Sequence, residues 1–152
     1  MSLPFIKTEA AGNDLILVDI RERRGVDLPD LARRMCDRHL GIGGDGLLAI
    51  EKHPNFVPFV RMFNPDGTED FCGNGMRCVA AWLHATGQAS GDSVTMRTPR
   101  GVHEATVQPG EPGSYYVTVA LLRPEFEPPL IPVNMDGDRI LDRNLRVRDN
   151  VR

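Results

Sequence analysis

One segment limits the possible folds of this chain more than any other. A helix is predicted from Met76 to Ala85, and its residues are apolar on nearly every side. Gly87 follows closely and is typical of the position just after a helix end. A helix with a single apolar face can lie on a surface, whereas one that is apolar nearly all round must be covered on most sides. We therefore expect the rest of the chain to wrap around it.

The segments on either side of this helix are mostly short apolar and β-branched runs, which are typical of strands. A second, amphipathic helix is predicted after Asp27, a suitable N-cap, with Cys36 on its apolar stripe. Pro58 lies within one run and predicts an edge strand or a bulge there. The predicted strands are Leu3–Thr8, Leu15–Ile20, Leu47–Glu51, Phe56–Phe63, Ser93–Thr98, Val102–Gln108 and Ser114–Leu122. This pattern predicts an α+β fold, with a curved, largely antiparallel or mixed sheet wrapped around a central buried helix.

Three glycine-containing segments connect these elements. Gly12 and Asn13 both tolerate left-handed backbone angles and predict a tight turn. A β-turn is predicted over residues 64–67, with proline second and glycine fourth. The glycine-dense segment 41–46 lacks the Lys-Ser/Thr ending of a P-loop and precedes a strand, so it is weak evidence for phosphate binding.

Composition bounds the possible partners and the compartment. The 152 residues carry a net charge of −3, which argues against nucleic acid or an anionic membrane surface as the main partner. No apolar run approaches the roughly 20 residues of a membrane span, and residues 1–7 do not resemble a signal peptide. Three cysteines cannot all pair internally, which favours a reducing, cytoplasmic setting.

The chain divides into two predicted parts. Residues 1–122 hold all the predicted strands and helices and are expected to form one domain. Residues 123–152 are first proline-rich and then rich in Arg, Asp and Asn, and the last fourteen residues, with five arginines against two aspartates, carry a charge of +3. We interpret residues 123–152 as a linker or as the start of a further domain.

Cys72 is the candidate reactive residue. It lies at or just before the start of the buried helix, where unpaired N–H groups and the positive end of the helix dipole favour a thiolate. Gly73 and Gly75 leave those amides uncovered, so an anion such as a carboxylate could bind beside the sulfur. The same pattern also fits an inert cysteine at an ordinary turn, and spacing alone leaves both interpretations open.

The other cysteines and the histidines offer no second centre. Cys78 lies six residues on, roughly 9 Å along the helix axis and rotated away, so a disulfide with Cys72 is not expected. We predict that both Cys36 and Cys78 belong to the core. The four histidines have no partner at metal-ligand spacing, and His103 is expected at the surface, like His53. Neither a metal nor a cofactor is predicted.

Four sequence blocks together resemble the diaminopimelate epimerase family. The first is Gly12-Asn13-Asp14, and the second is Arg38-His39-Leu40-Gly41-Ile42-Gly43-Gly44-Asp45-Gly46. The third, Phe63-Asn64-Pro65-Asp66-Gly67-Thr68-Glu69, runs into the fourth, Cys72-Gly73-Asn74-Gly75-Met76-Arg77. They occur in the family's order and span residues 5 to 87, and the strands up to residue 122 fit more loosely.

The resemblance implies a cofactor-independent isomerase built from two similar halves, with the active site between them. One cysteine from each half faces the substrate α-carbon; a thiolate removes the proton and the opposite thiol returns one. By position, Cys72 is the catalytic cysteine of the first half. Asn13 and Asn64 match substrate-binding asparagines, and Gly73 and Asn74 match helix-start residues that hold the α-carboxylate.

The chain departs from the family pattern in three places. Residues 7–12 differ from the usual sequence before Gly-Asn-Asp, and four residues rather than five separate Gly67 from Cys72. The second Cys-Gly block and the Glu-Arg pair of the other half are not found. We therefore expect an N-terminal half that does not racemise amino acids alone and requires a C-terminal half or a partner chain.

Three functions remain open for such a half. The first is diaminopimelate epimerisation, from the LL to the meso form, in lysine and cell-wall precursor synthesis. The second is racemisation of a different amino acid, and the third is non-catalytic carboxylate binding with a partner. The face that would meet the other half is expected to promote self-association, so a homo-oligomer is expected.

Overall fold

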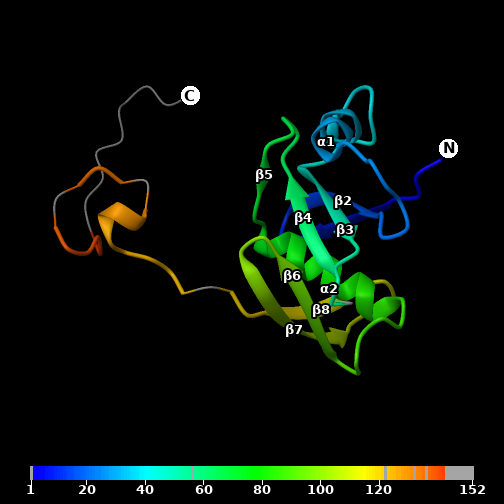
Figure 1. The fold of residues 1–152 in the computed structure, drawn as a ribbon. Coiled ribbons are helices and arrows are strands. Elements are labelled where there is room, and N and C mark those ends of the chain that lie inside the picture. Colours follow the sequence, from blue (N-terminus) through cyan, green and yellow to red (C-terminus); the bar gives the residue numbers. More distant parts are fainter. Residues whose placement is uncertain (1, 56, 122, 132, 136, 143–152) are drawn as a thin grey trace. The chain divides into compact units, whose positions relative to one another are not determined.

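The computed structural model describes residues 2–142, apart from residues 56, 122, 132 and 136 (Figure 1). Internal contacts divide the chain into two compact units, Met1–Leu121 and Leu122–Arg152. The strands and α-helices that the structure describes belong to the first unit.

The first unit contains a single mixed sheet. Its strands are β1 (Ile6–Ala10), β2 (Asn13–Asp19), β3 (Gly46–Glu51), β4 (Phe59–Phe63), β5 (Glu69–Asp70), β6 (Ser93–Thr98), β7 (Gly101–Pro109) and β8 (Tyr115–Val119). The order across the sheet is β1-β2-β3-β4-β6-β7-β8, and the short β5 pairs with β4. The β2–β3 and β4–β6 pairs are parallel and the others are antiparallel. The predicted mixed sheet is confirmed.

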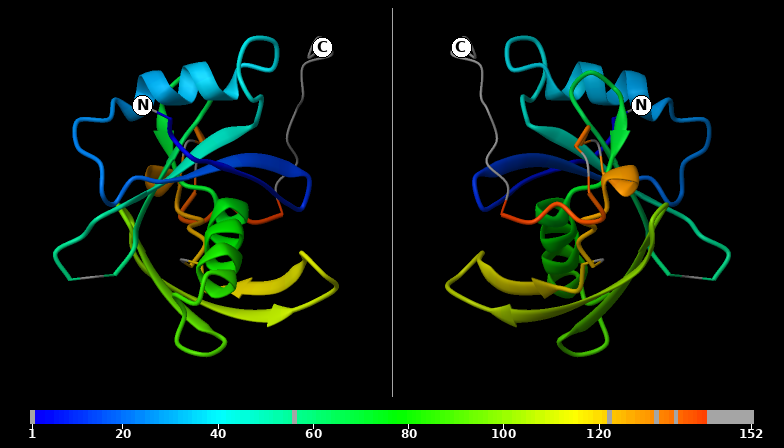
Figure 2. Two further views of the ribbon diagram at one scale, coloured as in Figure 1. Left: turned by 90° about the vertical axis from the view of Figure 1, so that its right-hand side faces the viewer. Right: turned by 90° about the vertical axis from the view of Figure 1, so that its left-hand side faces the viewer.

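Helix α2 (Gly73–Ala85) occupies the hollow of this sheet, with β2 and β3 on one side and β7 and β8 on the other (Figure 2). Its buried side chains, among them Met76, Val79 and Leu83, contact the inward residues of the surrounding strands. The helix begins three residues before the predicted start. It ends as predicted: Gly87 is left-handed at φ 71°, and its N–H donates to the carbonyl of His84.

Helix α1 (Leu28–Cys36) covers the outer face of β2 and β3. The predicted cap is confirmed, because the Asp27 side chain accepts a hydrogen bond of 3.0 Å from the backbone N–H of Asp30. Alternate residues of β2 point to opposite sides: Leu17 contacts the core around α2, and Ile16 contacts the core beneath α1. Burial on both faces explains why β2 and β3 are continuously apolar rather than alternating.

The first hairpin differs from its prediction by a few residues. β1 runs from Ile6 to Ala10, and the left-handed residues are Ala11 (φ 51°) and Gly12 (φ 89°), whereas Asn13 already belongs to β2. A type I′ hairpin turn, with two central residues, needs positive φ at both of them. The pairing of Ala10 with Asn13 therefore places the turn one residue earlier than the amino-acid types suggest.

The prediction for Pro58 was wrong. β4 is an interior strand, with β3 on one side and β5 and β6 on the other. Pro58 lies just before the strand, where its missing N–H costs no sheet bond, and its carbonyl accepts a hydrogen bond of 2.9 Å from the Arg97 N–H. The predicted strand start, residue 56, lies outside the described residues.

In the second unit the described residues include one short 3₁₀ turn, η1 (Pro128–Leu130). The Ile140 N–H donates to the Phe126 carbonyl at 2.7 Å. Most of the predicted arginine-rich end, residues 143–152, lies outside the described part of the chain. Among the residues that are described, none belongs to a helix long and apolar enough to span a membrane.

Candidate active site

Cys72 is the N-cap residue of α2. Its backbone is extended (φ −131°, ψ 111°), and its Sγ accepts a hydrogen bond of 3.3 Å from the Gly75 N–H. The geometry of a helix start leaves the amides of Gly73 and Asn74 without an intrahelical acceptor. These donors and the positive end of the α2 dipole therefore meet beside a half-buried thiol, a setting that favours negative charge.

Gly75 allows the first turn of α2 to lie directly on β3. A Cβ atom at this position would be 2.7 Å from Cδ2 of Leu48, a fully buried side chain. At Gly73 the same atom would be 3.4 Å from Cδ1 of Leu121, which is an ordinary contact. The close approach at Gly75 thus sets the depth of the helix start, and with it the position of Cys72.

Two of the predicted substrate-binding residues are in contact. Nδ2 of Asn74 donates a hydrogen bond of 2.8 Å to Oδ1 of Asn13, the first residue of β2. The Arg77 guanidinium, one turn further along α2, donates to Oδ1 of Asn74. The site thus contains a chain of three polar side chains next to Cys72, and Arg77 is a member to which the sequence assigned no role.

Asn64 lies at the same end of the sheet but makes its hydrogen bonds elsewhere. It directly follows Phe63, which pairs with Leu47 of β3. The residue before Leu47, Gly46, pairs with Leu15 of β2, which lies two residues after Asn13. Its Nδ2 donates to Oγ1 of Thr68 at 3.0 Å. Asn64 therefore belongs to its own β-turn, which is closed by a bond of 2.9 Å from the Gly67 N–H to the Asn64 carbonyl.

An ionic cluster holds the segment that carries Asn13. Arg38 donates to both carboxylate oxygens of Asp14, at 2.6 and 3.1 Å, and to Asp45 at 2.8 Å. Lys7 donates to Asp14 as well, at 2.8 Å. The Arg38 guanidinium, followed by the Lys7 ammonium, holds the pKa of the Asp14 carboxyl well below its usual range. Two of the blocks recognised in the sequence are thus joined through their charged residues.

A pocket of about 220 Å³ lies beside Cys72, which forms part of its wall. Glu69, Asp70 and Phe71, in the short segment before Cys72, form part of its wall, together with Arg100. The Phe71 ring contacts two groups: the His103 ring, whose centroid is 5.1 Å away, and the Arg100 guanidinium at 5.4 Å. The residue preceding Cys72 is therefore fixed by packing.

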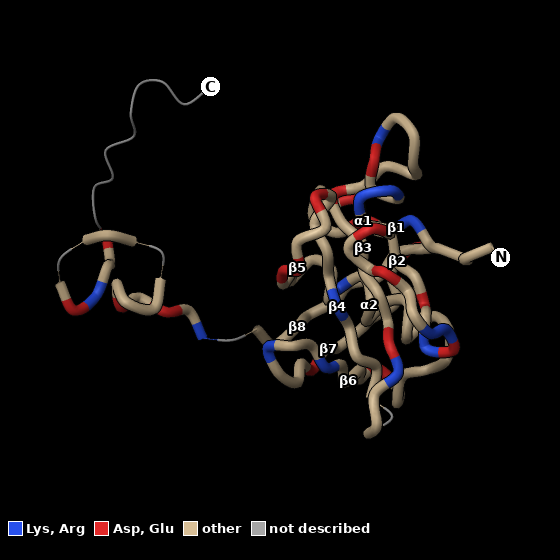
Figure 3. The backbone as a smooth tube through the Cα atoms, turned by 45° about the horizontal axis from the view of Figure 1, so that its top comes forward, with Lys and Arg blue, Asp and Glu red and all other residues tan. Residues whose placement is uncertain are grey.

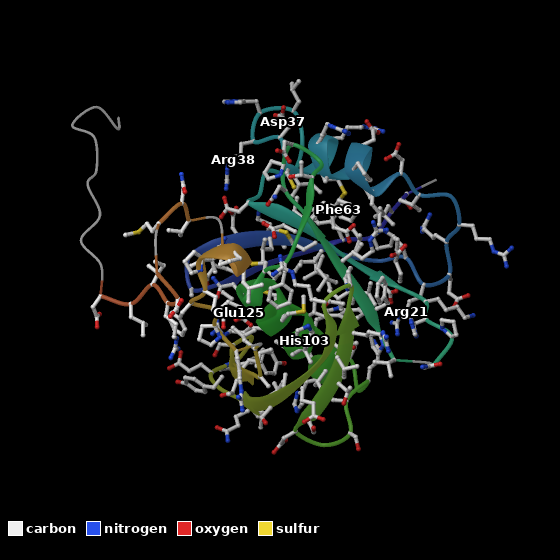
Figure 4. The ribbon with its side chains drawn as sticks, turned by 60° about the vertical axis from the view of Figure 1, so that its left-hand side comes forward. Arg21, Asp37, Arg38, Phe63, His103 and Glu125 are labelled. Carbon is white, nitrogen blue, oxygen red and sulfur yellow. The ribbon has the colours of Figure 1, made fainter. Side chains whose placement is uncertain are left out.

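The prediction that His103 lies at the surface was wrong. This side chain is 2% exposed, points inward from β7 (Figure 4) and shares a hydrogen bond of 2.9 Å between Nε2 and Oγ1 of Thr98. The signal was present in the sequence, because His103 alternates in step with Ala105 and Val107, the inward residues of the same strand.

The remaining thiols belong to the core, as predicted. Cys36 and Cys78 are 2% and 4% exposed, and burial raises the pKa of both thiols.

No cluster of three or more potential metal ligands occurs in the described part of the chain. Acidic and basic residues are interspersed along the backbone (Figure 3).

Comparisons with known proteins match most of the first unit. A family model described as diaminopimelate epimerase covers residues 5–121. A diaminopimelate epimerase of Pelotomaculum thermopropionicum is 38% identical over 144 residues, or 93% of this chain and 51% of that protein. A diaminopimelate epimerase of Xanthomonas campestris is 42% identical over 86% of this chain and 46% of that protein.

A further relative has a different name: an O-ureido-serine racemase of Streptomyces lavendulae is 39% identical over 92% of this chain and 48% of that protein. The chain spans about half the length of the curated relatives it matches.

Solved structures share the fold at low sequence identity. A phenazine biosynthesis protein of the PhzF family from Bacillus anthracis has a TM-score of 0.54 and 21% identity, covering 74% of this chain and 36% of that one. A probable proline racemase of Agrobacterium radiobacter has a TM-score of 0.52 and 19% identity, covering 77% of this chain and 45% of that one. These likenesses concern the α+β architecture alone.

Proposed function

The chain belongs to the diaminopimelate epimerase family, and we propose from this premise that it provides one half of a two-base amino-acid epimerase. In this proposal Cys72 is the acid or base on one face of the substrate α-carbon. The observation that carries it is the position of the Cys72 thiol, which caps α2 beside the amides of Gly73 and Asn74. A carboxylate bound by those amides would place its α-carbon near the sulfur.

The chemistry follows from this arrangement. As a thiolate, Cys72 takes the α-proton, and the C–H electron pair passes into the carboxylate as a carbanion-like species. A thiol on the opposite face then donates a proton, and the stereocentre inverts. The α-proton is a weak acid, so the developing charge on the carboxylate requires donors that are already in place. The amides at the start of α2 and the side chain of Asn13 would supply them, and Asn64 would contact the rest of the substrate.

The second base is proposed to come from outside the 152 residues of this chain. The buried Cys36 and Cys78 have raised pKa values and keep their protons at neutral pH. A two-base mechanism also needs the opposite face of the α-carbon to be covered, because excluded water strengthens the fields that act on the carbanion. We therefore assign the second cysteine to the half that completes the relatives' length.

LL-diaminopimelate is the first substrate to test, because the Pelotomaculum and Xanthomonas relatives are both named diaminopimelate epimerase. A different amino acid is the second candidate. The segment between Gly67 and Cys72, one residue shorter than expected, forms β5 and lines the pocket beside Cys72. The O-ureido-serine racemase is similar over almost the same share of the chain. A change in that segment would alter the substrate while leaving the acid–base chemistry intact.

Exchange of the α-hydrogen in heavy water tests the proposal. The chain is expressed together with a second half carrying a Cys-Gly block and incubated with LL-diaminopimelate, O-ureido-serine and a panel of other amino acids. Deuterium incorporation with inversion is expected for one of them. The chain without the second half is expected to show none, and inversion by the chain alone would overturn the division between halves.

Cys72→Ser and Cys72→Ala separate chemistry from helix capping. Both variants are expected to lose at least a thousandfold in the rate of inversion, of the order seen when an essential acid or base is removed. Serine is itself a good N-cap, whereas alanine costs about 1 kcal/mol of stability. An inversion rate in Cys72→Ser equal to that of the wild type would remove Cys72 from the mechanism and favour a non-catalytic, carboxylate-binding half.

A further inference from the structure

The direction of the hydrogen bond between Asn13 and Asn74 is not determined by these two residues alone. Each amide has one oxygen and one NH₂ group, so the pair can bond in either sense, with Asn74 donating to Asn13 or accepting from it. The two arrangements are nearly equivalent as hydrogen bonds, but they leave opposite groups of Asn13 unused. In one, two N–H donors remain, and in the other an oxygen remains.

Arg77 removes this ambiguity. A guanidinium carries only donors, so its bond to Asn74 must be received by Oδ1. The NH₂ group of Asn74 is then directed to Asn13, whose Oδ1 accepts it at 2.8 Å. Nδ2 of Asn13 takes no part in this chain of bonds. All three side chains are partly buried, so water competes less for these bonds than it would at an open surface.

We propose that Arg77 is a positioning residue that sets the orientation of both asparagine amides, so that Asn13 presents its NH₂ group to an anionic ligand. The inference rests on the proposed function, because the ligand group is the carboxylate of the amino-acid substrate. A carboxylate only accepts hydrogen bonds. With the amides reversed, Asn13 would direct an oxygen at it, and attraction would become repulsion. A bond from a charged donor biases the two orientations by about tenfold to a hundredfold.

Four variants of Arg77 and Asn74 distinguish orientation from packing. Arg77→Lys keeps a donor-only group, and Arg77→Met removes it at similar length. Arg77→Gln restores a hydrogen bond but offers both an acceptor and donors, so it stabilises without fixing the direction. Asn74→Asp keeps a partner for Arg77 but cannot donate, so Asn13 must turn its NH₂ group inward. Arg34→Met is the matched control, because Arg34 is an exposed arginine on α1.

Side-chain amide NMR of the ¹⁵N-labelled chain gives a readout that does not depend on activity. In the wild type and in Arg77→Lys, one set of NH₂ resonances is expected for each asparagine, with slow solvent exchange for Asn74 and faster exchange for Asn13. In Arg77→Met and Arg77→Gln, both amides are expected to populate two orientations, with averaged or doubled signals. Asn13 and Asn74 signals in both variants that match the wild type would overturn the inference.

Kinetics of the two-half enzyme provide the second readout. Arg77→Met and Arg77→Gln are expected to raise KM about twofold, because the competent orientation falls from nearly all to about half of the molecules. Arg77→Lys is expected to stay near the wild type, and Asn74→Asp, which holds Asn13 in the reversed orientation, to raise KM about tenfold or more. A KM for Arg77→Gln equal to that of Arg77→Lys would also overturn the inference. Absence of α-hydrogen exchange in the wild type would instead contradict the proposed function, while the NMR result would still decide the role of Arg77.

Discussion

Nδ2 of Asn74 lies 2.8 Å from Oδ1 of Asn13, although the two residues are 61 positions apart in the chain. One is the second residue of α2, and the other is the first residue of β2. Their contact shows that the start of the central helix is aligned with the end of the first hairpin. The thiol of Cys72 and the asparagine amides are therefore placed together by the way the sheet curls around α2.

The ion pairs of Asp14 make the stability of this end of the sheet dependent on pH. Because Arg38 and Lys7 lower the folded-state pKa of Asp14, the stability that these ion pairs contribute is fully present above the unfolded-state pKa of 3.8. This stability is lost as the pH falls below that value. Asp14→Asn is expected to lower stability at pH 7 and to flatten the acid dependence below pH 4, measured by thermal unfolding between pH 2 and 7. Asp30→Asn, at an exposed pair on α1, is the control and should change both the stability and the acid dependence much less. A wild-type acid profile in Asp14→Asn would contradict the ionic role.

Gly75→Ala tests the close contact between α2 and β3. The added methyl group would meet Cδ2 of the buried Leu48 at 2.7 Å, and such overpacking costs about 1–3 kcal/mol. Gly73→Ala is the matched control: its new atom meets Leu121 at an ordinary distance, and alanine favours a helix by about 1 kcal/mol over glycine. Denaturant titration of both variants measures the difference. Equal stability would show that the helix start is not set by Gly75.

Thr98→Val probes the buried hydrogen bond of His103. Replacing the hydroxyl leaves a ring nitrogen unsatisfied inside the protein, at a cost of about 1–3 kcal/mol. The double variant Thr98→Val/His103→Leu removes both partners and should be less destabilised than the sum of the two single variants. Strict additivity, measured by urea unfolding, would mean that the two side chains do not interact.

The three thiols should react at different rates with a disulfide reagent such as DTNB. Cys36 and Cys78 are buried, with pKa values raised by that burial, whereas Cys72 is half-buried at a helix start. One rapid equivalent is expected at pH 8, with two more after denaturation. Cys72→Ser should eliminate the rapid equivalent. Three equally fast thiols in the native chain would contradict the assignment of two cysteines to the core.

The central helix, its glycine stop and the longer strands around it were predictable from the sequence, whereas the two-residue β5 was not predicted. Each depends on a local pattern: apolar residues all round α2, a left-handed residue at Gly87, and continuous apolar runs in β2 and β3. The position of Cys72 at the N-cap was predictable for the same reason. Local patterns were insufficient at Pro58, because whether a strand is an edge depends on neighbours far away in sequence.

The sequence by itself determined most of the elements, the family and the candidate residues, since these depend on residue type and short-range spacing. Only the tertiary structure decided which side chains meet. It buried His103 between Thr98 and Phe71, left Asn64 bonded to its own turn, and joined Asn13, Asn74 and Arg77 into one hydrogen-bonded chain. The physical reason is that such contacts are set by sheet register and curvature, which depend on packing summed over the whole domain.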